Sequence, residues 1–511
     1  MASPLRHPLS AAIWLVMAVI YLPLLPAVAM LFTPALSLDS WQALADEPQL
    51  PQAFAATLVS TLLATLGSLV IALGFIMLLW PGERWRRLCT QLPWMLAVPH
   101  VAFATSALLL FAEGGLFYHA CTFCSPQLDR YGIGLGLTLA VKESAFVLWA
   151  LYAALPEAQL AQKNVVLRTL GYGRLQRLCW LVLPTIAPAL GAVMLAVLAW
   201  SLSVVDVAII LGPGNPPTLA VLAWQWLSQG DAQQQAQGTL VCLLLLLTLA
   251  LLAGVGFGIW KVWRRTLPNL SGVRRRASLP VPEKSLAWWL PGCGILCAIV
   301  LLGLARPIDA ALSPLTTSLT LGMLSGVLAL GLSFLWLEWG PRRGALWIWL
   351  PLALPALPLV SGQYAVALTL GIDGQFAAVL WGHLLWVLPW TLLVLQPAWQ
   401  KLDPRLFLSA RTLGWGRMKI FWMLKCPLLV RPALLAFATG FSVSMAQYMP
   451  TLWLGAGRFA TLTTETVALS SGGSLPILAT RALGLLLVTG IVFGIAALLS
   501  RLAGRYRRGL R

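Results

Sequence analysis

The sequence predicts an all-α, polytopic membrane protein with about twelve transmembrane helices, and three observations support this prediction. Of the 511 residues, 59% are hydrophobic and 10% are charged, which leaves too little polar surface for a soluble globular protein. Apolar stretches of about 20 residues, long enough to cross a bilayer as a helix, recur between Ala12 and Leu499. The alternating apolar and polar residues of a membrane β-barrel are not found.

The expected spans form two sets of six. The first stretch follows the basic Arg6 and begins like a signal peptide. It is long for one and lacks a convincing small-residue cleavage site, so we expect it to be the first span. The twelve expected spans lie near residues 12–32, 58–80, 92–112, 131–155, 181–211, 239–262, 287–304, 316–337, 345–361, 376–397, 427–452 and 478–500.

Basic residues test this arrangement, because the cytoplasmic loops of membrane proteins are enriched in Lys and Arg. When the N-terminus is placed inside, most of the 34 Lys and Arg residues fall in loops on that side. The exceptions are Arg130, Arg306, Arg458 and Arg481, with Lys142 inside a span. Both termini are therefore expected in the cytoplasm. Topology accounts for the net charge of +18, so no nucleic-acid partner is expected.

A polar, basic stretch that contains Pro268, Pro280 and Pro282 separates the two sets of spans. It predicts a cytoplasmic linker over residues 263–286. The first domain is then expected over residues 1–262, with a core of about 56–260. The second is expected over 287–511, with a core of about 314–500.

Two loops carry an internal repeat: the first repeated loop, residues 168–184, and the second repeated loop, residues 411–427. Seven residues match without a gap, at an offset of 414 − 171 = 243. The matched residues are Arg168, Thr169, Leu170, Gly171, Gly173, Arg174 and Pro184 in the first loop, and Arg411, Thr412, Leu413, Gly414, Gly416, Arg417 and Pro427 in the second.

Nearer the start of each half the offset is 259, which aligns Pro99 with Pro358. Since 259 − 243 = 16, we expect sixteen extra residues in the first half, in the outer loop Glu113–Arg130. Six spans in each half, repeated in the same orientation, predict a pseudo-two-fold axis along the membrane normal. A solute would then pass between the halves.

Each repeated loop has the pattern of a turn between two short helices at the membrane surface. Paired glycines permit the turn, and the residues after it place apolar side chains on one helical face. An interfacial hairpin with basic anchors would explain the charge, because of the positive-inside rule. It would not explain why seven residues are repeated at the same place in both halves.

The repeated loops resemble the EAA motif of type I ABC importer permeases, with their MetI-like permease domains. Two such domains in one chain look most like the iron(III), thiamine and sulfate branch. The resemblance implies coupling helices that dock on cytoplasmic ATPase subunits through Arg168, Gly171, Gly173, Arg174, Pro184, Arg411, Gly414, Gly416, Arg417 and Pro427. The Glu-Ala-Ala positions depart from the motif and read Val165-Val166-Leu167 and Leu408-Ser409-Ala410.

The sequence contains no Gly-Lys step, and therefore no Walker A loop to hold ATP phosphates. The resemblance implies ATP hydrolysis by two copies of a partner ATPase subunit, a periplasmic substrate-binding protein, and location in a bacterial inner membrane. The histidines are scattered at His7, His100, His119 and His383, without a catalytic or metal-binding pattern. We expect no enzyme activity, cofactor or metal in this chain.

Ionisable residues inside spans are costly and often face a wet interior. Lys142, Glu143, Asp206 and, more weakly, Gln447 are therefore candidates for a translocation path. The alternative is that each is tied to a neighbouring helix for structure. Lys142 and Glu143 point about 100° apart on a helix, so they are not expected to pair with each other.

Other polar residues have simpler interpretations. His383 is expected to be a packed helix residue. Cys121 and Cys124 lie in the outer insertion, where they could oxidise in a periplasm. The other six cysteines are expected to be mainly small core residues, at Cys89, Cys179, Cys242, Cys293, Cys297 and Cys426.

A secondary transporter of the major-facilitator type is the main alternative, because it also has six plus six spans and a basic central linker. That family concentrates its motif in the loop after the second span of each half. Here those loops, near 84–88 and 342–346, match poorly, and the strong repeat follows the fourth span. A membrane-embedded enzyme is a third class, disfavoured because no active-site cluster is visible.

Overall fold

The structure is a computed structural model of the chain, and it describes residues 6–22, 24–112, 115–118, 129–266, 283–306, 312–340 and 345–505. Most of these residues are helical, and no strand occurs among them. The predicted all-α fold is therefore confirmed. Much of the expected linker and of the outer insertion, including Cys121 and Cys124, lies outside the described residues.

The first half begins with short helices and continues with long apolar ones. Its helices are α1 (Arg6–Tyr21), α2 (Leu24–Phe32), η1 (Pro34–Leu36), α3 (Leu38–Ala45), α4 (Leu50–Leu79), α5 (Glu83–Ala97), α6 (His100–Phe111), α7 (Ile133–Ala154), α8 (Glu157–Thr169), α9 (Arg174–Arg177), η3 (Leu178–Val182), α10 (Leu183–Ser203), α11 (Asp206–Leu211), α12 (Leu219–Leu227) and α13 (Ala232–Thr266).

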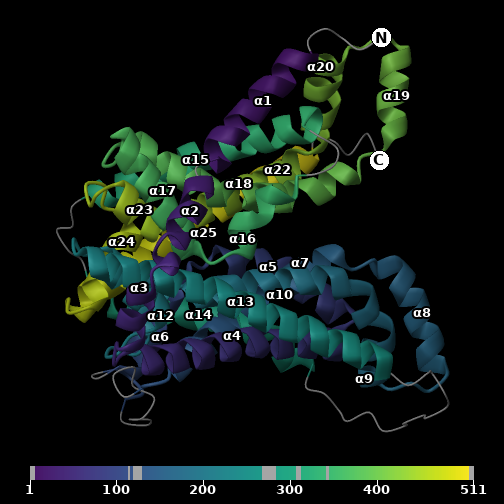
Figure 1. Ribbon diagram of the computed structural model, residues 1–511. Coiled ribbons are helices and arrows are strands. Elements are labelled where there is room, and N and C mark those ends of the chain that lie inside the picture. The colour runs from purple at the N-terminus through teal and green to yellow at the C-terminus, as the bar shows by residue number, and fades with distance from the viewer. Residues whose placement is uncertain are drawn as a thin grey trace.

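The second half has a similar order, without counterparts of α2, η1 and α3 between its first two helices. Its helices are α14 (Glu283–Leu304), α15 (Ser313–Trp339), η4 (Leu346–Trp349), α16 (Leu350–Ala353), α17 (Ala356–Leu370), α18 (Phe376–Gln400), α19 (Pro404–Thr412), α20 (Arg417–Ile420), η5 (Phe421–Lys425), α21 (Cys426–Leu428), α22 (Val430–Met445), α23 (Met449–Leu454), α24 (Leu462–Ser470) and α25 (Leu475–Arg505). Figure 1 shows α15, α18 and α22 in an upper layer, above α4, α7, α10 and α13.

The number of membrane spans follows from helix length and composition. Nine helices in the described ranges are long and apolar enough to cross a bilayer. Three bent pairs pass the same test together, with bends of 87° between α5 and α6, 111° between α16 and α17, and 76° between α21 and α22. Counting each pair as one span gives up to twelve, in agreement with the prediction of about twelve.

The expected spans 92–112 and 345–361 are not single helices. Each breaks before a proline, Pro99 or Pro355, that serves as the N-cap of the next helix. A proline disfavours the helical conformation of the residue before it, and Val98 and Leu354 are extended, with ψ values of 114° and 152°. Pro99 therefore corresponds to Pro355 in the fold, at an offset of 355 − 99 = 256, and the alignment of Pro99 with Pro358 is wrong.

This register also corrects the length of the insertion. Helices α7 and α18 begin at Ile133 and Phe376, and 376 − 133 = 243, so the later offset already holds there. The extra residues of the first half therefore precede Ile133, as expected, and number 256 − 243 = 13, fewer than the sixteen expected. The expected span 181–211 also ends early, because α10 stops at Ser203 and α11 begins separately at Asp206.

The first helix of each half packs against the opposite half. In α1, the Tyr21 hydroxyl donates to the Ile348 carbonyl at 3.1 Å, and the ring centroids of Trp14 and Trp336 lie 5.5 Å apart. In α14, the Cys297 thiol donates to the Ala102 carbonyl at 3.6 Å. The two halves are therefore joined by exchanged helices as well as by the linker between them.

Close helix packing in each half depends on small residues. A Cβ atom added at Gly67 of α4 would lie 2.7 Å from the Cβ atom of Ala140 in α7. In the second half, Gly326 of α15 is also closely packed, since an added Cβ would lie 3.0 Å from the ring of Phe437 in α22. Small residues let membrane helices approach closely, and association in lipid depends on such packing.

We expect Gly67→Val to lower the apparent melting temperature of the detergent-purified chain, because overpacking the α4–α7 contact costs about 1–3 kcal/mol. Gly74→Val is the matched control. Gly74 lies in the same helix, and nothing lies within 4 Å of a Cβ added there. Equal melting temperatures for the two variants would show that the α4–α7 approach does not limit stability.

Candidate functional site

Two parts of the molecule are candidates for function: the pair of repeated loops and a cavity between the halves. Figure 1 places α8 and α9 at the same end of the molecule as α19 and α20, on the right of the view. The first repeated loop begins in α8 and ends in α10, and the second begins in α19 and ends in α21. Each half therefore presents one loop at the same end.

Both α8 and α19 end in the same hydrogen-bonded cap. The Gly171 amide donates to the Arg168 carbonyl at 3.0 Å, and the Tyr172 amide donates to the Leu167 carbonyl at 3.0 Å. These are the two bonds of a Schellman motif, which places a left-handed residue just after the helix. Gly171 has a φ of +88°, a conformation that glycine adopts without the steric cost of a Cβ atom.

The second cap has the same two hydrogen bonds as the first. The Gly414 amide donates to Arg411, and the Trp415 amide donates to Ala410, both at 3.0 Å. Gly414 has a φ of +80°. The other glycines, Gly173 and Gly416, are N-caps of α9 and α20 with ordinary extended conformations. The repeated Leu-Gly step therefore forms the same turn in both halves.

The repeated prolines have a local structural role as well. Pro184 and Pro427 each follow a five-residue π-helical segment, η3 in the first half and η5 in the second. A proline lacks the amide hydrogen and its ring collides with the carbonyl four residues earlier, so the preceding turn cannot keep α-helical bonding. The wider π turn is a common way to accommodate this within a helix.

Apolar side chains are exposed on both repeated loops and on the helices before them. At the Glu-Ala-Ala positions, Val165 and Val166 are exposed in the first half and Leu408 in the second. Leu413, directly before the second turn, has 76% of its surface exposed. Arg168 and Arg411 are also exposed, whereas Arg174 and Arg417 are half-buried. This surface can form apolar contacts with another protein.

The two loops are anchored differently. In the first half, Arg177 donates to the Asn164 side chain at 2.9 Å, and the Trp85 indole donates to Glu157 at 2.8 Å. In the second half, the buried carboxylate of Glu338 at the end of α15 pairs with both Arg417 and Lys425. The distance from Glu338 to the Arg417 Nε atom is 2.6 Å.

The Glu338 cluster also includes aromatic rings. Arg417 lies over the ring of Trp339 at 5.5 Å, and Lys425 lies over the ring of Trp399 at 4.8 Å. One repeated arginine, Arg417, therefore has partners within the chain, and these hold the second loop against α15. Glu338 was not predicted from the sequence. An acidic residue at the end of an apolar span was the available signal.

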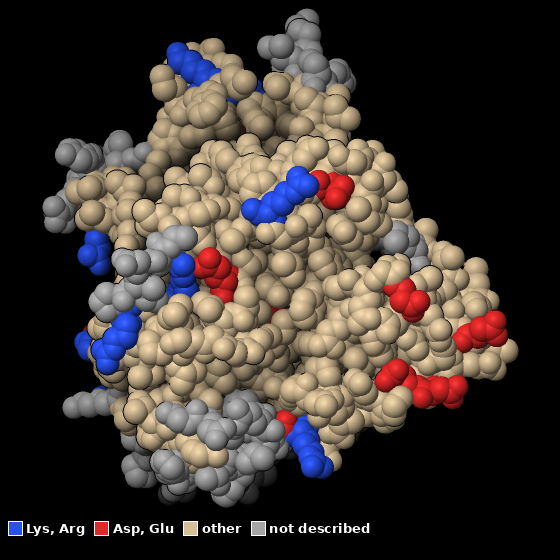
Figure 2. Space-filling model, turned by 90° about the vertical axis from the view of Figure 1, so that its left-hand side faces the viewer, with Lys and Arg blue, Asp and Glu red and all other residues tan. Residues whose placement is uncertain are grey.

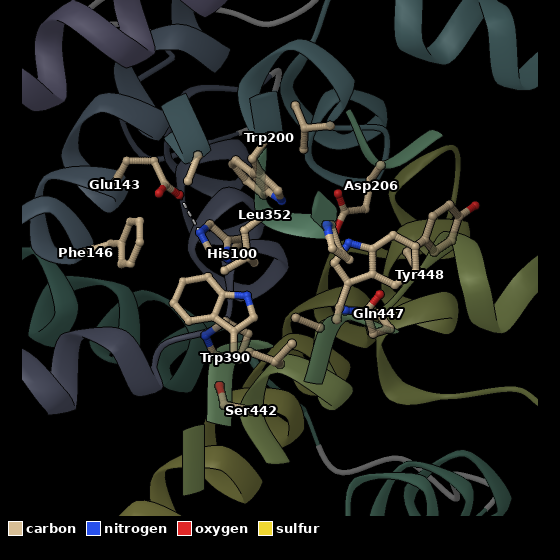
Figure 3. A pocket seen from close by; sticks show the side chains of 18 of the residues that line it. His100, Glu143, Phe146, Trp200, Asp206, Leu352, Trp390, Ser442, Gln447 and Tyr448 are labelled. Carbon is tan, nitrogen blue, oxygen red and sulfur yellow. Dashed lines mark hydrogen bonds and ion pairs between the residues drawn. The ribbon is translucent and has the colours of Figure 1, made fainter. Parts of the chain in front are cut away.

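The cavity, of about 210 Å³, lies between the two halves (Figure 3). Four helix breaks meet there: those between α5 and α6, α10 and α11, α16 and α17, and α22 and α23. Irregular backbone at membrane depth is tolerated where it is buried in protein or lines a cavity. Residues of these breaks that line it are Val98, Pro99, Val204, Val205, Leu354, Ala446, Gln447 and Tyr448.

The structure places all four path candidates, Lys142, Glu143, Asp206 and Gln447, in the lining of this cavity. Lys142 and Glu143 have separate partners. The Lys142 ammonium donates to the Met95 carbonyl at 2.7 Å, and Glu143 lies 2.7 Å from the His100 Nε2 atom. Figure 3 shows His100 between Glu143 and Asp206.

The expected likeness between Gln447 and Asp206 needs a correction. Helix α11 begins at Asp206 and α23 begins at Met449, so the offset of 243 holds without a gap. Met449 occupies the equivalent position, and Gln447 lies in the break before it. Both Gln447 and Met449 line the cavity, which the two halves therefore line with different chemistry.

Aromatic residues and one histidine of the lining were not selected from the sequence. His100 packs on Trp200 with ring centroids 4.5 Å apart, and Phe146 packs on Trp390 at 4.9 Å. A histidine directly after a proline in an apolar span could have been selected from the sequence. The four tryptophans of the lining, Trp149, Trp200, Trp386 and Trp390, could not. His383 is buried away from the lining, between Ser444 and Thr451 at 2.8 and 2.9 Å, as expected for a packed residue.

The described residues include histidines, cysteines and carboxylates, the usual ligands of metal ions. No group of three or more His, Cys, Asp or Glu side chains within them could hold a metal ion. The six described cysteines are free thiols, and Cys89, Cys242 and Cys297 are buried. Within these ranges the lining of the cavity therefore combines ionisable, hydrogen-bonding and aromatic side chains.

We expect Glu338→Gln to destabilise the second repeated loop by about 1–3 kcal/mol, because two cations lose their shared carboxylate. Limited trypsin digestion should then cut faster near Arg411. Glu83→Gln is the control, since Glu83 pairs with Arg87 in an exposed i,i+4 bridge that contributes little. If digestion of the two variants were equally fast, the cluster would not hold the loop.

Comparison with known proteins adds independent evidence. No family model matches the chain, and no solved structure matches it. The chain is 59% identical over all 511 residues, and over the full length of both proteins, to the inner membrane ABC transporter permease protein YnjC of Escherichia coli (strain K12). The length and central linker of the sequence already suggested a likeness to this enterobacterial permease, and the comparison confirms it.

This finding decides between the alternatives that the sequence left open. The relative is a permease of an ATP-binding-cassette transporter, not a secondary transporter of the major-facilitator type. At this identity over the full length of both proteins, the chain belongs to the family of inner membrane ABC transporter permeases.

Proposed function

We propose that the two repeated loops are the docking surfaces for two ATPase subunits, with one loop contacting each subunit. An ABC permease works in general with ATP-hydrolysing subunits and a binding protein. One observation carries the specific proposal. The same Schellman-capped turn occurs once in each half, at the same end of the molecule, beside exposed apolar side chains.

The same proposal places both loops and both termini in the cytoplasm. The helices of the loops carry Arg168, Arg411 and other basic residues, in keeping with the positive-inside rule. Figure 2 views the opposite end, where the surface is mainly uncharged and carries both Asp or Glu and Lys or Arg residues. Acidic residues in segments at that end include Asp39, Asp46, Glu47, Asp231 and Asp373.

Helical segments that lead from each loop to the cavity support coupling between them. The first loop leads through η3 into α10, which ends at Ser203 in the cavity lining. The second leads through η5 and α21 into α22, which ends beside Ala446 of the lining. In the first half this connection is one long helical segment, Arg174–Ser203, whereas in the second it bends by 76° between α21 and α22. Movement of a docked subunit would reach the cavity through these packed segments.

Our proposal is that this chain forms the path of an importer and leaves ATP hydrolysis to its partners. Substrate delivered by a periplasmic binding protein would cross between the halves by alternating access. The chain itself would hold no nucleotide, cofactor or metal and catalyse no reaction. In support, the full sequence contains no Gly-Lys step, so it has no loop of the Walker A type.

Replacing Gly414 by Val should abolish co-purification of ATPase activity with the tagged chain, because a β-branched residue is strained at a φ of +80°. Gly171→Val should act in the same way, at a φ of +88°. Gly416→Ala is the matched control, with a φ of −69° and nothing within 4 Å of an added Cβ. Retention of ATPase activity by both Val variants, with membrane insertion intact, would rule out docking through these turns.

A cysteine placed at Leu413 should react with an impermeant maleimide only after the inner face of the membrane is opened. A cysteine placed at Asp231, in the loop between α12 and α13 at the opposite end, should react in intact spheroplasts. Both positions are exposed, so access decides the outcome. Reaction of the Leu413→Cys variant in intact spheroplasts would show that the proposed orientation is wrong.

A further inference from the structure

The two halves contribute different chemistry to the cavity. At the offset of 243, Glu143 of the first half corresponds to Trp386 of the second, and Asp206 corresponds to Met449. All four residues line the cavity. Glu143 and Asp206 therefore have no acidic counterparts in the second half, and they lie on the wall that the first half contributes. A packing role common to both halves does not require them.

Asp206 and Glu143, the two carboxylates of that wall, differ in their ion pairing. Glu143 pairs with His100, and the Lys142 ammonium is directed to the Met95 carbonyl. No ion pair joins Asp206 to a Lys, Arg or His among the described residues. A carboxylate in an apolar cavity is costly unless a positive charge compensates it.

Aromatic side chains form much of the remaining wall. Trp200 and Phe146 come from the first half, and Trp386, Trp390 and Tyr448 from the second. Figure 3 shows Trp200 and Trp390 on opposite sides of His100. The face of an indole attracts a cation, by about 0.5–2 kcal/mol depending on how far water is excluded. These residues therefore favour a ligand that is both cationic and partly apolar.

Other classes of ligand fit this lining less well. No arginine lines the cavity, and the one lysine is already bonded to a carbonyl, so an oxyanion would lack donors. A bare metal ion would need several His, Cys, Asp or Glu ligands together, and the described residues contain no such group. A neutral sugar would leave the Asp206 charge uncompensated.

We propose that the cavity selects a small organic cation, such as an amine or an N-alkylated heteroaromatic ring. The cationic group faces the Asp206 carboxylate, and the apolar part lies against the tryptophan rings. This inference rests on the proposed function of the cavity as the translocation path. Asp206 is then a specificity-determining residue, whereas Glu143 is paired with His100.

Isothermal titration of small probe molecules into the full chain in lipid nanodiscs tests this inference. The probes are 1-methylnicotinamide, nicotinamide and nicotinate, which have similar shapes and carry positive, zero and negative charge; choline is added as a non-aromatic cation. We expect 1-methylnicotinamide to bind about tenfold or more tightly than nicotinamide, a difference of about 1.4 kcal/mol. Nicotinate should be the weakest ligand.

Variants test whether the Asp206 carboxylate causes the preference for the cation. Asp206→Asn should reduce the preference for 1-methylnicotinamide over nicotinamide to about twofold or less, because the charge is lost while the shape is kept. Asp206→Glu should retain it. Asp231→Asn, in the loop before α13, is the control and should bind as the unmodified chain does.

The results separate this inference from the docking proposal. Equal binding of the three nicotinic compounds, tighter binding of nicotinate, failure of every cation to bind in the millimolar range, or an unchanged preference in Asp206→Asn would each overturn it. ATPase co-purification is measured on the same preparations. If the cation preference fails while ATPase activity still co-purifies, docking stands and the substrate class is wrong. Loss of co-purification in the Gly414→Val variant leaves binding by the cavity unchanged.

Discussion

The rest of the structure depends on the requirement that backbone amides and carbonyls at membrane depth find partners inside the protein. Helices meet this requirement by themselves, and every break in a helix must be compensated by a neighbour. The Ser203 hydroxyl at the end of α10 accepts from the Ala356 amide at the start of α17, at 2.8 Å, across the boundary between the halves. The amides of Leu219 and Leu462 donate to the hydroxyls of Thr57 and Ser318 at equivalent places.

Because breaks are costly, their concentration around one cavity indicates where function lies. The four breaks leave backbone and short helix ends facing a common space, and the ionisable residues of the first half lie beside them. The capped turns of the repeated loops, which we propose as docking surfaces, precede α10 and α22 in the chain. In each half, helical segments thus join a surface turn to an internal break.

Much of this arrangement could be predicted from the sequence, because it depends on local chemistry. The expense of charge in lipid selected Lys142, Glu143 and Asp206, and the paired glycines of the repeated loops indicated a turn. Composition indicated an all-α membrane protein with about twelve spans, as the structure and the 59% identical relative confirm.

The features that were missed depend on contacts between distant parts of the chain. Glu338 lies 79 residues from Arg417, so no local pattern reveals their pairing. The tryptophans of the cavity come from α7, α10 and α18, which are far apart in the sequence, and in a chain with 25 tryptophans no single one is distinctive. The bends at Pro99 and Pro355 follow from proline chemistry, but hydropathy averaged over a window treats each bent pair as one apolar segment.

The exchanged packing of α1 and α14 has a consequence for how the chain is made. Tyr21 and the carbonyl it bonds are separated by 327 residues, so α1 leaves the ribosome long before its binding surface exists. At synthesis rates of about 5–20 residues per second, this interval is on the order of tens of seconds. During that time α1 lacks the contacts that the second half supplies, so its final packing awaits translation of that half.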